Sequence, residues 1–199
     1  MAQPPLTGVS SALSFNVKEF TLADNRVQAA QNRLKRLAES IDALTEKDEI
    51  VIRYMRDMAA LRRAAAAELH SICAGFVNSV NSLLTRGTVT LDPAEFSYAG
   101  FRDDAANLIQ MNIRGRILQV EYTATIDLSS TEDFRIPYTL EGFVRAFNQK
   151  LLDKNLIEEQ LIFYTLEKTG NMWRFFDART YRSGAFEQEY LVGLMEQII

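Results

Sequence analysis

The chain contains one histidine and one cysteine, His70 and Cys73, which lie three positions apart. On a helix this spacing brings both side chains to one face, as metal ligands require. A tetrahedral zinc site needs at least three protein ligands, however, and every nucleophile-histidine arrangement would depend on His70, which lies within a helical pattern. We therefore expect His70 on a solvated helix flank, Cys73 as a small apolar filler, and no metal, cofactor or catalytic residue.

Carboxylates occur as adjacent pairs at Asp103-Asp104, Glu132-Asp133 and Glu158-Glu159. Hydrolysis of a glycosidic bond needs two carboxyl groups that face each other across a cleft, whereas adjacent side chains diverge. The glycines are isolated in the sequence, so they form no loop of the type that holds phosphate. The sequence leaves enzymatic activity open and favours a non-enzymatic protein.

Arginine alternates with aromatic residues between Trp173 and Arg182, in contrast to the acidic average of the chain. Such residues on a sheet surface can stack on bases and neutralise phosphates. They can equally be core aromatics whose arginine neighbours pair with carboxylates such as Glu167 and Asp177. A net charge of -4 and a sequence pI of about 5.2 favour the second interpretation and disfavour nucleic acid as a partner.

The most informative pattern is a heptad rhythm in the N-terminal half. Apolar residues recur from Val27 at alternating steps of three and four, which are the a and d positions of a coiled coil. We expect contact with another helix at Val27, Leu34, Leu37, Ile41, Leu44, Met55 and Met58. The e and g positions hold few charges, so the pattern leaves parallel and antiparallel pairing open.

No glycine or proline occurs between Gly8 and Gly75, so a helix of roughly 60 residues and on the order of 90 Å is expected. Such a helix exceeds the width of a compact domain, and part of it must pack against another helix of the chain or another copy. Thr45 to Asp48 has the spacing of a capping box and offers a hairpin turn as the alternative. The unbroken heptad phase favours a continuous helix.

Strand patterns dominate after residue 87. Arg116 to Leu128 alternates apolar and polar residues and predicts a strand, with Arg114-Gly115 as a turn back to residues 109–113. Residues 140–153 have helical spacing and predict a covering helix. Residues 158–182 predict a hairpin with large side chains on both faces, and a last helix follows Ser183-Gly184.

These elements predict an α+β protein, with a long N-terminal helix or helical hairpin followed by a small antiparallel sheet and two covering helices. We expect an N-terminal tail or edge strand over 1–20, a coiled-coil-like region over 21–86, and a sheet domain over 87–199. One cysteine excludes an intrachain disulfide, and no apolar run has the length of a membrane span. These features predict a cytoplasmic protein.

The leading hypothesis is a non-enzymatic interaction or assembly protein that self-associates through the heptad helix and presents the α+β domain. One alternative is a ligand-binding or catalytic domain with a pocket between the sheet and helix 140–153, and another is a nucleic-acid-binding module that uses the 158–182 hairpin. The candidate ligand surface for these alternatives comprises Tyr122, Tyr164, Trp173, Arg174 and Arg179. The biological partner, substrate and pathway are not encoded in any recognisable motif.

Overall fold

The computed structural model describes residues 12–130 and 135–199, with side chains from Arg26 onward except that of Glu158. The chain divides into two units, Met1–Met55 and Arg56–Ile199, which we call the helical unit and the sheet unit and describe separately. The expected tail before residue 12 and the acid pair Glu132-Asp133 lie outside the described residues.

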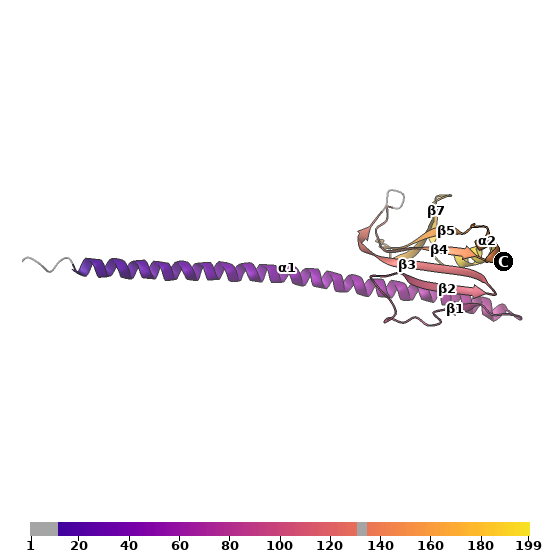
Figure 1. Cartoon of the computed structure of the whole chain (residues 1–199), viewed down its shortest axis with the longest axis horizontal. Coiled ribbons are helices and arrows are strands. Elements are labelled where there is room, and N and C mark those ends of the chain that lie inside the picture. Colours follow the sequence, from indigo (N-terminus) through magenta and orange to yellow (C-terminus); the bar gives the residue numbers. More distant parts are fainter. Residues whose placement is uncertain (1–11, 131–134) are drawn as a thin grey trace, which may run out of the picture. The chain divides into compact units, whose positions relative to one another are not determined.

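Helix α1 spans Ala12–Leu83 as one element (Figure 1). Thr45–Asp48 are therefore helix interior, and the alternative of a hairpin turn is wrong. The Thr45 hydroxyl donates to the Ile41 carbonyl oxygen at 3.0 Å, a bond within the same helix. Residues 14–21 are also helical, so the expected edge strand there is wrong, because no glycine or proline interrupts a helix that starts at Ala12.

The sheet unit contains one seven-stranded sheet in which every strand pairs antiparallel with its neighbour in sequence. The strands are β1 (Thr90–Asp92), β2 (Asn107–Ile113), β3 (Arg116–Ser129), β4 (Tyr138–Phe147), β5 (Glu158–Thr165), β6 (Met172–Asp177) and β7 (Arg182–Ala185). The fold is thus α+β, as the sequence predicts, but the sheet is larger than the small one expected.

The two predicted hairpins are present. Arg114 and Gly115 connect β2 to β3 with φ values of 51° and 80°, which suits a tight turn whose two central residues are both left-handed. Asn112 supports this turn, because its side-chain oxygen accepts the Gly115 N–H at 2.9 Å. β5 pairs with β6, and their large side chains divide between the two faces as expected.

The predicted helix over residues 140–153 is wrong. Residues 138–147 form strand β4, which lies between β3 and β5, and only Gln149–Asp153 form a short helix, α2. The Asn148 side chain starts α2 by accepting the Leu151 N–H at 3.1 Å. Leu140 and Val144 face the main core while Phe143 lies on the opposite face, so β4 is apolar on both sides and its period of two is hidden.

One face of the sheet packs against α1, between Ala65 and Val77, and against the last helix, α3 (Gln188–Glu196). Figure 1 shows β2 and β3 running alongside the C-terminal part of α1. Trp173 is fully buried there, and its indole N–H donates to the Ala65 carbonyl oxygen at 2.7 Å. A smaller apolar cluster occupies the other face and comprises Tyr138, Phe163 and Phe176, with Ile136 and Leu161 packed against it.

Arg62 fixes α1 to the one irregular part of the β3–β4 ladder. Its Nε donates to the Thr139 hydroxyl at 2.8 Å, and its guanidinium also donates to the Thr125 carbonyl oxygen. The register of β3 against β4 shifts at this point, after Ala124. Polar contacts as well as apolar packing therefore set the position of α1 on the sheet.

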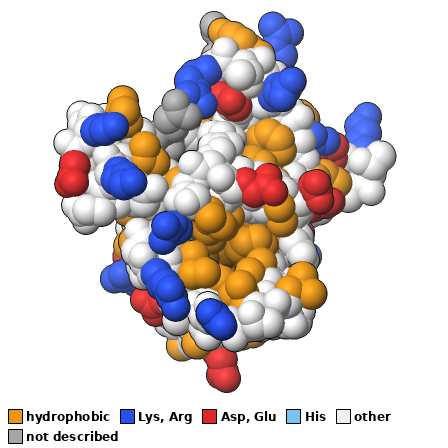
Figure 2. Space-filling view, turned by 90° about the vertical axis from the view of Figure 1, so that its right-hand side faces the viewer, with side chains coloured by type: hydrophobic (Ala, Val, Ile, Leu, Met, Phe, Trp, Pro, Cys, Tyr) orange, Lys and Arg blue, Asp and Glu red, His pale blue; other side chains and the backbone are white. Residues whose placement is uncertain are grey.

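Apolar surface also remains on the sheet unit. Figure 2 shows hydrophobic side chains gathered in a hollow on the face turned to the viewer, with Lys and Arg side chains along part of its border.

Within residues 12–130 and 135–199, no helix combines the length and the apolar character that crossing a membrane requires.

Candidate functional site

The helical unit carries a row of exposed apolar side chains, which Asp48 interrupts. We call this row the seam, and it comprises Val27, Leu34, Leu37, Ile41, Leu44, Val51 and Met55. Each of these side chains is between 53% and 65% exposed. The a and d positions of a helix form a single stripe, so these residues present one ridge to solvent. Met58, one heptad step further, is half-buried and belongs to the sheet unit.

The same heptad phase continues into the sheet unit, where its residues are core. Ala65 and Leu69 are fully buried, and Phe76 is 1% exposed. The sheet and α3 therefore cover the C-terminal part of the stripe. The N-terminal part has the same residue pattern and lacks a cover among the described residues.

The flanks of the seam differ along its length. Near Met55 the neighbouring residues Ile50, Ile52 and Tyr54 are also exposed, which widens the apolar stripe. Near Leu37 the flanks are polar, and the Ser40 hydroxyl donates to the Arg36 carbonyl oxygen at 2.8 Å. A hydroxyl satisfied within its own helix needs no hydrogen bond from a partner, so it can border an apolar contact at little cost.

Three of the five residues expected on a ligand surface lie in the buried core of the sheet unit. Tyr122, Tyr164 and Trp173 are buried between the sheet and α1, with the Tyr122 and Trp173 rings edge to face at 5.6 Å. Burial raises the pKa of the Tyr122 phenol and raises that of Tyr164 to about 12. The Tyr164 hydroxyl lies 3.4 Å from Glu68 Oε2. These side chains serve packing in this structure.

The two arginines lie elsewhere. Arg174 Nε contacts Glu167 Oε1 at 2.6 Å, and Arg179 Nε contacts Asp177 Oδ1 at 3.5 Å. The hydrogen bond from Arg174 lowers the pKa of Glu167. Both guanidinium groups thus have carboxylate partners, so the structure does not gather the five residues into one surface.

His70 and Cys73 form no metal site with other residues, and none of the described residues makes a cluster of three potential metal ligands. His70 is buried, contrary to the expected solvated flank, and its Nε2 lies 2.8 Å from the Pro93 carbonyl oxygen. The ring donates from this nitrogen, because a carbonyl oxygen can only accept. Cys73 is an apolar filler, and burial raises the pKa of its thiol to about 12, which disfavours the reactive thiolate.

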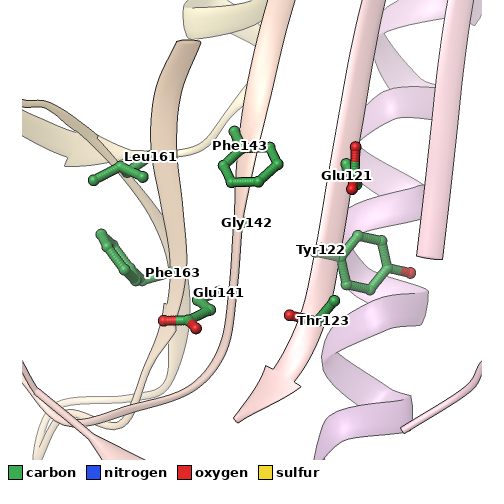
Figure 3. Close-up of a pocket in the computed structure, with 8 residues that line it drawn as sticks. All are labelled: Glu121, Tyr122, Thr123, Glu141, Gly142, Phe143, Leu161 and Phe163. Carbon is green, nitrogen blue, oxygen red and sulfur yellow. The ribbon is translucent and has the colours of Figure 1, made fainter. Parts of the chain in front are cut away.

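No sequence pattern predicts the hollow of about 310 Å³ that lies on the sheet face opposite α1 (Figure 3). Phe143, Leu161 and Phe163 provide its apolar wall, and the carboxylates of Glu121 and Glu141 lie at its border. Arg145 contacts Glu121 at 3.1 Å and lies 4.8 Å from the Phe143 ring centre. The hollow combines this apolar wall with carboxylates at its border, and Thr123 of β3 pairs across the strands with Glu141 of β4.

Comparison with known protein families, curated proteins and solved structures finds no match for this chain. The chain is therefore classified by its fold alone. It is an α+β protein with a long N-terminal helix and a seven-stranded antiparallel meander.

Proposed function

We propose that this chain is a non-enzymatic assembly protein that self-associates through the seam of the helical unit and presents the sheet unit. The observation that supports the proposal most directly is the contrast along one heptad phase, with Leu69 fully buried and Leu34 65% exposed. Seven large apolar side chains in one ridge form a patch of the kind that marks an interaction site.

A second copy of the chain fits this ridge better than an unrelated surface does. The a and d spacing is the one that interlocks with the same spacing on another helix, knobs into holes. Complete burial of a Leu or Ile side chain stabilises by roughly 1.5–3 kcal/mol, and about half of that gain remains for side chains already half-covered by their own helix. In a pair of identical helices, the seam residues of both copies contribute this free energy of burial.

Replacement of Leu37 by Asp tests the proposal. The wild-type chain is expected to show twice its 22.6 kDa monomer mass by light scattering or sedimentation, with reversible dissociation on dilution. Leu37→Asp removes two buried leucines per pair and introduces two carboxylates, which weakens association at least about 100-fold. Ala43→Asp is the matched control, because it adds the same charge at an exposed c position away from the seam.

The circular dichroism of both variants should match that of the wild type, because Leu37 and Ala43 are exposed in the single chain. A wild-type chain that remains monomeric at high concentration contradicts the proposal. Equal weakening by the two substitutions would also contradict it, since the contact would then depend on charge and not on the seam.

A further inference from the structure

We infer that the partner of the seam is a second copy in antiparallel orientation, centred near Glu39. This inference rests on the proposed function and adds the direction and register of the pairing. It depends on the distribution of charge along the helical unit and on the residue at one a position. Every residue that it uses is exposed in the single chain.

Charge is segregated along the described part of the helical unit. Residues 26–36 contain four basic residues and no acidic residue, which gives +4, while residues 37–49 contain five acidic residues and one lysine, which gives -4. In a parallel pair, the basic residues 26–36 of the two copies would lie side by side, and so would the acidic residues 37–49. The axes of two paired helices lie about 8–10 Å apart, and charges on their outer faces lie further from one another, so this preference is largest at low salt. Antiparallel copies place the basic block beside the acidic block.

Asp48 gives the same direction by an independent route. It occupies an a position of the heptad, in line with Ile41 and Met55. In a parallel pair the two Asp48 carboxylates would face each other in the seam, where desolvated like charges repel. In an antiparallel pair each Asp48 faces another residue of the second copy.

The register follows from matching apolar positions. In an antiparallel pair an a position faces a d position, and centring near Glu39 matches Val27 with Val51, Leu34 with Leu44, and Leu37 with Ile41. Asp48 then faces Ala30, whose neighbours along the seam edge are Arg26 and Arg33. A small residue opposite the carboxylate leaves room for these guanidinium groups to reach it. One like-charge contact, Arg33 with Lys47, remains at the solvent edge.

Cysteine cross-linking distinguishes the two directions. Ser40 lies one residue from the proposed centre at a g position, where antiparallel copies bring equal residues together and parallel copies do not. Leu44 occupies a d position, which faces itself only in a parallel pair. In the proposed register the two Leu44 positions lie ten residues out of alignment, or about 15 Å, beyond the reach of a disulfide.

We expect Ser40→Cys to form a disulfide-linked dimer under mild oxidation and Leu44→Cys to form little. A mixture of Leu34→Cys and Leu44→Cys should yield the mixed dimer. The wild-type chain is the background control, because Cys73 is fully buried.

Efficient cross-linking of Leu44→Cys without Ser40→Cys would overturn the antiparallel inference and leave self-association intact. A monomeric wild-type chain with no cross-link in any variant would instead refute the proposed function itself. The two failures therefore give different results in the same set of experiments.

Discussion

Replacement of Gly142 by alanine tests the central packing of the sheet. A Cβ at this position would lie 2.0 Å from the Glu121 carbonyl oxygen and 2.7 Å from the Tyr122 Cα, both in the backbone of β3. Ordinary van der Waals contacts between such atoms require roughly 3.5 Å, so β3 and β4 must separate locally by about 1 Å or more. The close approach of these strands therefore depends on glycine.

A separation of this size breaks the hydrogen bonds on either side of Gly142. Two ladder bonds at about 1–1.5 kcal/mol each, together with the disturbed packing, lower the free energy of unfolding by about 2–4 kcal/mol. For a small protein this corresponds to a fall of about 1–2 M in the urea midpoint. Gly75→Ala is the matched control, because Gly75 is exposed within α1 and its Cβ meets no atom within 4 Å. That variant should gain about 0.5–1 kcal/mol from helix propensity.

Urea unfolding followed by tryptophan fluorescence measures both effects. Trp173 is the only tryptophan and is 1% exposed in the core of the sheet unit, so its emission reports on that unit. If Gly142→Ala unfolds at the same urea concentration as the wild type, the close contact between β3 and β4 is not present and the argument fails.

Two further predictions concern ionisable groups in the sheet unit. The Arg179 backbone N–H donates to Asp177 Oδ1 at 3.0 Å and lowers the pKa of that carboxyl, with a further hydrogen bond from the Thr180 hydroxyl. A carboxyl whose pKa is lower in the folded state stabilises above its unfolded pKa and loses this contribution as the pH falls through the folded value. Asp177→Asn should therefore lower the free energy of unfolding near neutral pH and make that free energy fall less steeply on acidification, as measured by urea midpoints between about pH 2 and 6. A variant whose midpoints depend on pH as those of the wild type do would contradict this argument. Burial raises the pKa of the Cys73 thiol to about 12, so a thiol reagent should leave Cys73 unlabelled in the native chain and label it fully in urea. The exposed thiol of a Ser40→Cys variant is the control and should react at once. Rapid labelling of Cys73 in the native chain would show that the core is open to the reagent.

Elements with a single clear period were predictable from the sequence. The heptad phase and the lack of glycine and proline predicted α1 across residues 45–48, and strict alternation predicted β3. The division of Tyr164 and Phe163 between two sheet faces followed from the same alternation. In each case a single period explains the positions of the apolar residues: about 3.6 residues for the helix and 2 residues for the strands.

Strand β4 was not predictable in this way. Leu140, Phe143, Val144 and Phe147 fit helical spacing, yet the segment is a strand because β3 and β5 pair with it on both edges. Long-range pairing of this kind overrides local preference. The helix of residues 140–153 that was expected to cover a pocket is not present, and a hollow of about 440 Å³ lies instead beside β4, α2 and α3, with Val144, Leu151 and Leu194 among its lining residues.

The candidate site shows the same limit. The heptad pattern predicts contact with another helix at Leu37 and its neighbours, which are exposed in this structure, so that contact stays a prediction; Leu69, at an equivalent kind of position, is buried. The sequence predicts Tyr122 and Trp173 as candidate ligand contacts, because aromatic residues suit both cores and binding sites. Only the packing of α1 against one face of the sheet shows that these two side chains belong to the core and not to a binding site.

The placement of Arg62 has a consequence for the size of any assembly. Arg62 occupies an a position, where its guanidinium donates to the Thr139 hydroxyl and the Thr125 carbonyl oxygen, and the heptad residues Ala65 and Leu69 that follow are buried against the sheet. In the proposed pairing, the heptads available to a second helix therefore end before Arg62, because the a and d positions that follow are already buried in the sheet unit. Under antiparallel pairing each copy offers and receives the same surface, so the contact closes on itself and growth into a filament is prevented.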